Sequence, residues 1–292
     1  MISIVTVTYK SEATISQCIE SVLRQAQPGT QLIIIENSQN EELKVWQERH
    51  PEHIQVIVNT DNVGFGRACN QGLKMAEGEF VYFLNPDCVL AEGVLASLRH
   101  YMNAHASIGL AGCRLVAENG LEKSHAAIKY PGQQFAPQLF NKLPGSIAWV
   151  LGASMFARRT VLEAIGGFDG DYELYGEDID ICLRIRLCGH GIGHCQSATV
   201  MHMGGHSASS LGAEKRWLLK QLGLNLFLRK HYSPELSAKI ICRDGWRARV
   251  RLTLLRVRLV CGLINKQDDR LCKYKAVLTA AQMNKLKPRA EQ

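Results

Sequence analysis

The stretch Phe80-Val81-Tyr82-Phe83-Leu84-Asn85-Pro86-Asp87 decides the fold. Its five consecutive apolar or aromatic residues are typical of a strand buried on both faces at the centre of a parallel sheet. Proline has no backbone N–H, so ladder pairing is expected to end at Pro86. In open α/β sheets, ligands bind beyond the carboxyl ends of the strands. The stretch therefore predicts a buried strand that carries Asp87 to a ligand site.

Strand and helix patterns alternate on both sides of this stretch. Ser11 is expected to cap a helix whose apolar residues recur with helical spacing from Ile15 to Leu23. Such alternation predicts an α/β fold with a doubly wound, mostly parallel, Rossmann-like sheet, in which the strand ends at Tyr9, Glu36 and Asp87 meet at one edge. The expected strands are 2–7, 32–35, 54–58, 80–84, 108–113 and 148–156.

Two later segments differ from this regular pattern. Residues 114–146 hold several glycines and prolines and are expected to cross the surface as a long loop, a kind of segment that is often functional. Further on, Gly176 breaks the chain before a helix that is expected to run to Cys188. Glu177 and Asp178 fall in the first turn of that helix, where carboxylates favour the helix dipole.

Bulk composition indicates a globular protein. The 292 residues are 46% hydrophobic and 21% charged, which excludes a disordered or fibrous chain. The first residues lack a basic n-region, so no secretory signal is expected, and no apolar run reaches the roughly 18 residues of a membrane span. The ten cysteines include no CxxC pair, and we expect free thiols in a reducing cytosol.

Charge divides the chain into two expected regions. Residues 1–212 hold 15 Lys/Arg and 21 Asp/Glu, a net charge of −6, and residues 213–292 hold 19 and 6, a net charge of +13. The second region reads as mainly helical, with five arginines at 247, 249, 251, 256 and 258 that fall on two sides of a helical wheel. We expect contact with an anionic membrane, and a packed helical bundle or a protein partner are the alternatives. Nucleic acid is disfavoured because no recognised binding module accompanies the charge.

A set of motifs follows a fixed order along residues 1 to about 210. The motifs are Val5-Thr6-Val7-Thr8-Tyr9, Ile35-Glu36-Asn37-Ser38, the glycine-rich segment 62–72, Leu84-Asn85-Pro86-Asp87, Gly152-Ala153, Gly166-Gly167-Phe168-Asp169, Gly176-Glu177-Asp178-Ile179-Asp180 and His202. This set resembles the family-2 inverting glycosyltransferases of GT-A fold. The Leu-Asn-Pro-Asp form at 84–87 is most similar to that of bacterial rhamnosyltransferases.

The resemblance implies a role for each matched position. Asp178 corresponds to the catalytic base and Glu177 to an acceptor-binding residue, while Asp87 and His202 correspond to ligands of Mg²⁺ or Mn²⁺. The nucleotide-sugar donor would be bound by Thr8, Tyr9, Glu36, Asn62, Gly64, Arg67 and Asn85.

Two positions depart from the family pattern. Glu36 stands where members usually have Asp, and Asn85 replaces the first carboxylate of the metal-binding motif, which leaves fewer anionic ligands. A hard divalent cation held by a carboxylate stabilises the charge that develops on a departing diphosphate, and a histidine ligand makes Mn²⁺ as suitable as Mg²⁺.

We therefore expect an enzyme that transfers L-rhamnose from dTDP-L-rhamnose, with inversion, to a saccharide or lipid-linked saccharide acceptor in cell-surface polysaccharide synthesis. A UDP-hexose is the alternative donor. A non-catalytic glycan-binding or scaffold protein is the alternative class. A nucleotidyltransferase is disfavoured because no basic glycine-rich loop follows the first strand. The expected location is the cytoplasmic face of the inner membrane, with residues 213–292 in contact with it.

Overall fold

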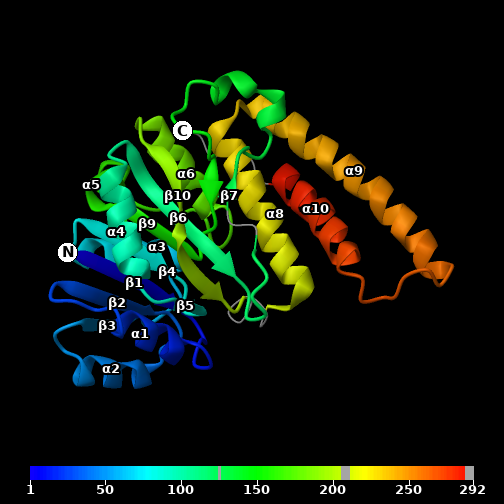
Figure 1. Cartoon of the computed structure of the whole chain (residues 1–292). Helices are drawn as coiled ribbons and strands as arrows, with labels where there is room; N and C mark the ends of the chain where they lie inside the picture. The colour runs from blue at the N-terminus through cyan, green and yellow to red at the C-terminus, as the bar shows by residue number, and fades with distance from the viewer. Residues whose placement is uncertain (124–125, 205–210, 287–292) are drawn as a thin grey trace.

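An eight-stranded sheet forms the centre of the computed structural model, which describes residues 1–123, 126–204 and 211–286 (Figure 1). The order across this sheet is β3-β2-β1-β4-β9-β6-β10-β5. Its strands are β1 (Ile2–Thr8), β2 (Thr30–Glu36), β3 (Ile54–Val58), β4 (Phe80–Leu84), β5 (Cys88–Leu90), β6 (Ile108–Val116), β9 (Ser154–Arg158) and β10 (Gly191–His202).

The predicted sheet edge is confirmed by the strand register. Strand β1 is parallel to both of its neighbours, with Thr8 opposite Glu36 on β2 and Val5 opposite Phe83 on β4. The carboxyl ends of these strands therefore lie together. Two strands run against the rest, because β9 is antiparallel to β4 and β6, and β5 is antiparallel to β10.

Helices cover both faces of the sheet (Figure 1). Ile2, Ile4, Phe80 and Tyr82 pack under α1 and α4, and their neighbours in sequence point to the face covered by α3, α5 and α6. This alternation explains why the Phe80–Leu84 run has no polar position. The helices of this region are α1 (Ile15–Leu23), α2 (Lys44–Arg49), α3 (Phe65–Met75), α4 (Val94–Ala104), α5 (Arg159–Ala164) and α6 (Glu177–Leu187), with a short 3₁₀ turn η1 (Glu41–Leu43).

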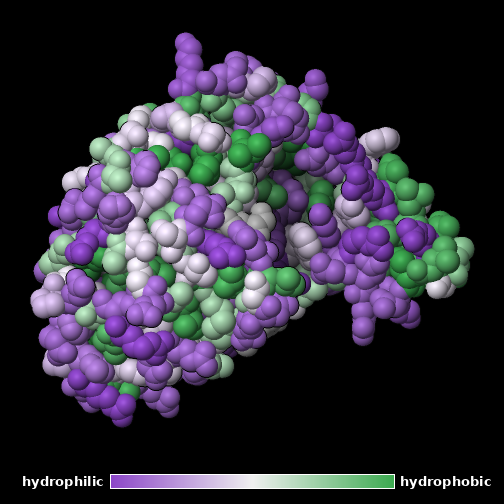
Figure 2. Space-filling view, viewed as in Figure 1, coloured by the Kyte–Doolittle hydropathy of each residue, from purple (hydrophilic) through white to green (hydrophobic). Residues whose placement is uncertain are grey.

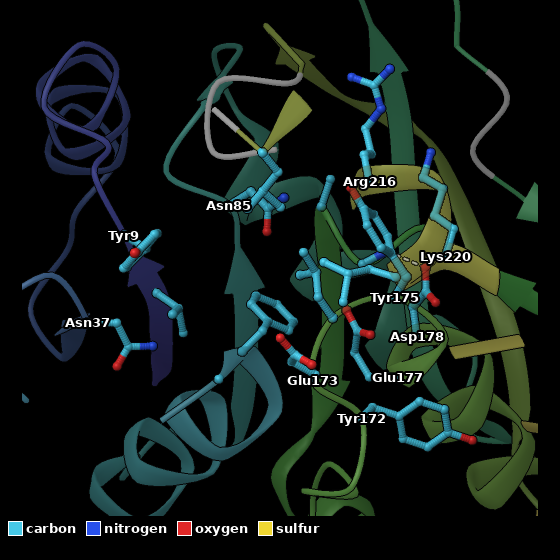
Figure 3. Close-up of a pocket in the computed structure, with 18 of the residues that line it drawn as sticks. Tyr9, Asn37, Asn85, Tyr172, Glu173, Tyr175, Glu177, Asp178, Arg216 and Lys220 are labelled. Carbon is cyan, nitrogen blue, oxygen red and sulfur yellow. Dashed lines mark hydrogen bonds between the residues drawn. The ribbon is translucent and has the colours of Figure 1, made fainter. Parts of the chain in front are cut away.

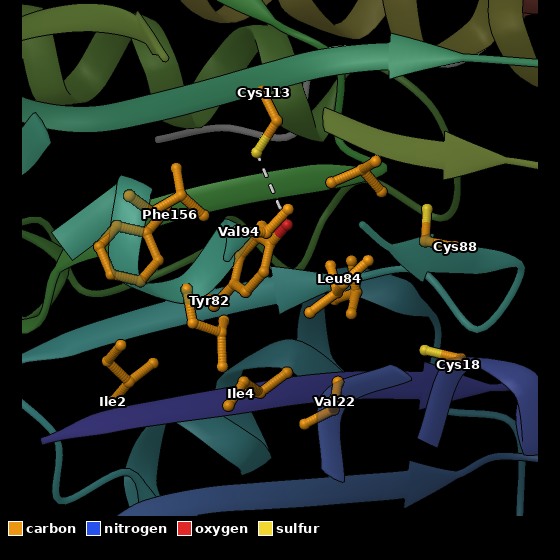
Figure 4. Close-up of a cluster of buried hydrophobic side chains, with 14 of the residues drawn as sticks. Ile2, Ile4, Cys18, Val22, Tyr82, Leu84, Cys88, Val94, Cys113 and Phe156 are labelled. Atoms are coloured by element: carbon orange, nitrogen blue, oxygen red, sulfur yellow. Dashed lines mark hydrogen bonds between the residues drawn. The ribbon is translucent and has the colours of Figure 1, made fainter. Parts of the chain in front are cut away.

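Tyr82 makes polar contacts within the apolar core on the face under α1 and α4 (Figure 4). The Tyr82 hydroxyl lies 2.8 Å from Ser154 Oγ and 3.6 Å from Cys113 Sγ. Because the hydroxyl finds partners on β6 and β9, this tyrosine is fully buried without an unsatisfied polar atom. All ten cysteines are free thiols in the described residues.

Two local predictions are wrong. The cap of α1 is Thr14, without a side-chain hydrogen bond, and Ser11 contributes its backbone carbonyl to Thr14 and Ile15 instead. The expected strand 148–156 is two strands, because the Leu151-Gly152-Ala153 segment turns between them. β8 (Trp149–Val150) pairs with β7 (Ala126–Ala127) in a separate ribbon, and β9 joins the main sheet.

Residues 213–286 are mainly helical, as expected, and they share a core with the preceding region. Tyr130 and Phe140, in the segment expected to be a surface loop, are buried against Phe227 and Tyr232. The expectation of a surface loop is wrong for this part of the segment, because stacked aromatic rings tie it to the C-terminal helices. The elements concerned are η2 (Gln133–Phe135), η3 (Pro137–Leu139), α8 (Gly212–His231), α9 (Pro234–Val260) and α10 (Asp269–Leu286).

Two other expectations concern the basic residues of the C-terminal region and membrane-spanning helices. Lys287 and Arg289, which add to the basic charge, lie outside the described residues. No described helix is long and apolar enough to cross a membrane. The boundary expected at residue 212 stays a prediction, and the shared aromatic core crosses it.

Candidate active site

A cavity of about 1020 Å³ lies at the carboxyl edge of the sheet. Its walls come from the ends of β1, β4 and β10, the turn before α3, the 170–175 loop, the start of α6, and α8. Figure 3 shows Tyr9 and Asn37 on one side of this space and Glu177, Asp178 and Lys220 on the other. Nine of the eleven predicted site residues line it: Tyr9, Asn62, Gly64, Arg67, Asn85, Asp87, Glu177, Asp178 and His202.

Asp87 and His202 come together because two strand ends are tied to each other. Pro86 ends β4, and the backbone turns so that the Cys88 N–H donates to the Asn85 carbonyl. The following strand, β5, pairs with the end of β10, which places His202 opposite Cys88. His202 Nε2 lies 3.4 Å from Asp87 Oδ1, and the Asp87 carbonyl accepts a hydrogen bond from the Met203 N–H.

The donor atoms of this pair fit a divalent cation. A carboxylate oxygen and an imidazole nitrogen are ligands of Mn²⁺ and similar ions. His202 Nδ1 is buried without a hydrogen-bond partner in the described residues, so no hydrogen bond at Nδ1 fixes the tautomer of the ring. Asp87, Cys88 and His202 place their ligand atoms within 4.8 Å of one another.

Cys88 is the member of this cluster that the sequence analysis missed. Its thiol is completely buried and donates to the Ala153 carbonyl. Burial, with the nearby Asp87 charge, raises the pKa of the Cys88 thiol well above its usual value. Because metals bind the thiolate, a protonated Cys88 is a poor ligand, and Asp87 and His202 remain the candidates.

Glu177 and Asp178 enter the cavity from the amino end of α6. Gly176, the residue before the helix, has a φ of 95°, a left-handed conformation that favours glycine. Asp178 Oδ2 accepts a hydrogen bond from the Gly152 N–H at 3.3 Å, and Oδ1 accepts one from the Ile179 N–H at 2.9 Å. These two bonds hold the Asp178 carboxylate at the cavity wall.

The two carboxyl groups hold their protons more tightly than usual. Burial, with the charge of Asp178, raises the pKa of Glu177 to about 8. Burial also raises the pKa of Asp178, although its backbone hydrogen bonds oppose the rise. Glu177 Oε2 is buried without a hydrogen-bond partner in the described residues. With a pKa of about 8, Glu177 keeps a proton at neutral pH, as one of two adjacent buried carboxyl groups does.

Asp180, two residues further along α6, behaves in the opposite way. It accepts hydrogen bonds from Arg184 Nε and His231 Nε2, both at 2.7 Å, and from the Tyr172 hydroxyl at 3.4 Å. Burial alone would raise its pKa, but the His231 and Arg184 contacts lower it. Since His231 ends α8, its hydrogen bond to Asp180 fastens α8 to the helix that bears the carboxylates.

Helix α8 forms one wall of the cavity. The sequence analysis had assigned the residues of this helix only to the basic C-terminal region. Lys215, Arg216, Trp217 and Lys220 line it, and Asp269 of α10 joins them. The Lys220 ammonium lies 5.1 Å from the centre of the Tyr175 ring. Burial lowers the pKa of Lys220, and the charge of Arg216 lowers it further. The run Lys215-Arg216-Trp217 was the available signal in the sequence, but only the helix packing places it here.

The opposite wall holds the residues expected to bind the nucleotide. Asn62 Oδ1 accepts a hydrogen bond from the Gly64 N–H, and Gly64 has a φ of 87° that opens the turn before α3. Thr8 and Glu36 do not line the cavity: both side chains are buried, and the Thr8 hydroxyl donates a hydrogen bond to the Glu36 carboxylate. Asn37, the next residue, lines the wall instead.

Comparison with known protein families gives one match over most of the chain. Residues 1–220 match the family model described as glycosyltransferase like family 2. The low-salt glycan biosynthesis hexosyltransferase Agl10 of Haloferax volcanii is 24% identical over 211 residues, 69% of this chain and 66% of that protein. The rhamnosyltransferase WbbL of Escherichia coli is 25% identical over 159 residues, 50% of this chain and 60% of that protein. The chain thus spans two thirds or less of these relatives.

Solved structures share the fold over nearly the whole chain. The mannosyltransferase PcManGT of Pyrobaculum calidifontis, solved with GDP-Man and Mn²⁺, superposes with a TM-score of 0.65 at 17% identity, covering 98% of this chain and 87% of that one. S. aureus TarS 1-349, solved with UDP-GlcNAc, gives a TM-score of 0.53 at 17% identity, covering 97% and 91%. These likenesses confirm the expected GT-A type α/β fold and its helical extension.

Proposed function

This chain belongs to the family-2 glycosyltransferases, and from that premise we propose that it transfers one sugar from a nucleoside diphosphate donor to a saccharide hydroxyl, with inversion. One observation carries the proposal: the Asp178 carboxylate and the Asp87–His202 pair face the same cavity. A base and a cation site on one cavity are what a direct displacement at a sugar carbon requires.

Asp178 is the proposed base. The hydrogen bonds from Gly152 and Ile179 hold its carboxylate in place and leave it facing the cavity. In this position it removes the proton of the acceptor hydroxyl as that oxygen attacks the sugar. Inversion follows from a single displacement, because the oxygen attacks the face opposite the diphosphate and no enzyme nucleophile intervenes.

Glu177 is the proposed acceptor-binding residue. With a pKa of about 8 it is protonated at neutral pH, so it can donate a hydrogen bond as well as accept one. A protonated Glu177 also removes a second negative charge from beside Asp178, which favours ionisation of the base.

Asp87 and His202 would hold Mg²⁺ or Mn²⁺, and the cation, when bound, neutralises charge on the departing diphosphate. Asn85 contributes an amide beside them and lacks the charge of a second carboxylate. Tyr9, Asn62, Gly64 and Arg67 would contact the nucleotide on the opposite wall. Thr8 and Glu36 would support that wall indirectly, because their buried side chains bond to each other next to Tyr9 and Asn37, which line the cavity.

The proposed donor is dTDP-L-rhamnose, and a UDP-hexose is the second candidate. Support for rhamnose comes from the Leu-Asn-Pro-Asp sequence and from the likeness to a rhamnosyltransferase. Support for a hexose comes from the likeness to a hexosyltransferase. The proposed acceptor is a saccharide, free or lipid-linked, in glycan synthesis, and the proposed place of action is the cytoplasm.

A nucleotide-sugar panel tests the proposal. With Mn²⁺ present, one donor is expected to raise the melting temperature most, and that donor is expected to lose its sugar to water slowly in the absence of acceptor. If a donor binds but neither hydrolysis nor transfer to any glycan occurs with wild-type protein, the non-catalytic glycan-binding alternative would replace this proposal.

A further inference from the structure

Helix α9 has two apolar faces, and only one of them is covered. The inner face packs on α10, where Leu252 and Leu255 are buried against Leu271. On the other side of the helix five apolar residues are exposed, at successive spacings of four, four, three and three that keep them on one stripe. They are Trp246, Val250, Leu254, Val257 and Val260, with exposed fractions of 64%, 42%, 60%, 57% and 87%.

Arginines border this stripe on both sides. At 100° per residue, Arg249 and Arg256 fall along one margin, and Arg247, Arg251 and Arg258 fall along the other. The sequence analysis placed the same arginines on two sides of the helix. The structure shows that exposed apolar side chains lie between them, so the two groups belong to one surface.

These arginines are available to an outside partner. None of the five forms an ion pair with a carboxylate in the part of the chain that the structure describes, and Arg251 donates only to the Tyr274 hydroxyl. The nearby Asp244 pairs with Arg243. The surface is therefore apolar at its centre and cationic at both margins.

The surface continues to the end of the arm that α9 and α10 form. Leu263, in the connection after α9, is 66% exposed. Figure 1 shows the two helices extending away from the sheet, and Figure 2 shows hydrophobic side chains gathered at their outer end. We name the five apolar residues of α9, Leu263 and the five arginines the arm surface.

We propose that the arm surface docks on an anionic lipid bilayer. Apolar side chains on one stripe of a helix enter the boundary between headgroups and acyl chains, and tryptophan favours that depth. Arginines at both margins reach lipid phosphates while their stems cover apolar surface. A second copy of the chain is disfavoured as the occupant, because a symmetric contact would bring the arginine rows of both copies together.

Docking of the arm surface would also set the position of the cavity relative to the membrane. Helix α10 lies between α9 and α8, and α8 lines the cavity with Lys215 and Arg216. The arm surface thus holds the cavity wall close to the membrane, where a lipid-linked acceptor is presented. This consequence rests on the proposed function, whereas lipid docking by itself does not.

Liposome flotation of the full chain tests the proposal. Vesicles of phosphatidylcholine with phosphatidylglycerol are compared with vesicles of phosphatidylcholine alone. We expect binding to the anionic vesicles that weakens as salt rises. The double variant Trp246→Ser with Leu254→Ser is expected to lower the partition coefficient at least tenfold, roughly the effect of removing two inserted side chains. Arg249→Gln with Arg256→Gln is expected to lower it by roughly thirtyfold at low salt, since each arginine contributes about 1 kcal/mol.

Two matched variants serve as controls. Leu121→Ser removes a leucine that is 67% exposed outside the arm, and Lys74→Gln removes an exposed cation on α3; both are expected to bind like wild type. Donor binding and circular dichroism of every variant report folding and the cavity, independently of lipid. Equal vesicle binding by wild type and the Trp246/Leu254 variant would overturn the proposal. So would a wild-type dimer that becomes monomeric in that variant without any lipid binding, since a second copy would then be the occupant.

Discussion

Gly223 of α8 lies against the backbone of Tyr175, so closely that a Cβ atom on Gly223 would stand 1.9 Å from the Tyr175 carbonyl oxygen. Tyr175 has a φ of 68° and precedes Gly176 and the Glu177–Asp178 pair. The C-terminal region therefore sets the conformation of the loop that delivers the proposed base, and α8 is part of the site.

Gly223→Ala is expected to abolish most activity and to lower stability by about 1–3 kcal/mol, because the new methyl group must displace α8 or the loop. Gly245→Ala is the matched control, since its Cβ would meet Ala281 at an ordinary 3.4 Å. Alanine also favours helix, so we expect this second variant to be about 0.5–1 kcal/mol more stable. Urea unfolding measures the stability of both variants. Equal stabilities of Gly223→Ala and Gly245→Ala would contradict the close contact at Gly223.

Asp178→Asn is expected to reduce transfer about 10²- to 10⁴-fold, because the amide cannot accept the acceptor proton. The affinity for the donor should not change, because Asp178 faces the acceptor and the substitution leaves the residues that would bind the nucleotide unaltered. The measurements are kcat for transfer and calorimetric donor binding, with Asp244→Asn, outside the cavity, as the matched substitution. Near-normal turnover by Asp178→Asn would exclude the proposed base.

Glu177 makes stability depend on pH. Its pKa rises from 4.5 to about 8 on folding, so between these values the folded protein holds a proton that the unfolded chain releases. Stability is therefore expected to fall as pH rises from about 5 to about 8, and Glu177→Gln is expected to flatten this dependence. Melting temperatures across the range test it, and Glu52→Gln, an exposed site, should keep the wild-type slope. An unchanged slope in Glu177→Gln would contradict the shift.

In the wild type, Mn²⁺ is expected to raise the affinity for a nucleoside diphosphate by at least about tenfold. Asp87→Ala is expected to remove this increase. Calorimetric titration with and without the ion gives the comparison. Cys88→Ala, at the neighbouring position, should keep that effect because its thiol is protonated and bonded to Ala153. Loss of the Mn²⁺ effect in Cys88→Ala alone would assign the ion to the thiol.

Asp180→Asn is expected to lower stability by about 3 kcal/mol, because it leaves Arg184 and His231 without the buried anion they share. The folded pKa of Asp180 is depressed, so its contribution is present above the usual pKa and is lost as pH falls through the folded value. Glu20→Gln, in an exposed pair with Arg24, should change stability by less than about 0.5 kcal/mol. Equal effects in chemical denaturation would contradict the buried role.

Local sequence determined the sheet and one edge of the site. Apolar runs with sharp ends predicted β1, β2 and β4, because a strand buried on both faces is made mainly of apolar residues, and Asp87 followed from the end of one such run. Gly176 marked the start of α6, because few other residues adopt its backbone conformation. These signals depend on a few neighbouring residues, so they are visible in the chain.

Tertiary structure alone decided which distant residues meet. The strand order brought His202 to Asp87, and a missing side chain at Gly223 let α8 close one wall of the cavity with Lys215 and Arg216. The arm surface on α9 was also hidden in the sequence, because a helix with two apolar faces gives no single amphipathic pattern. Only packing on α10 separates the covered face from the exposed one, since burial depends on neighbours that periodicity does not specify.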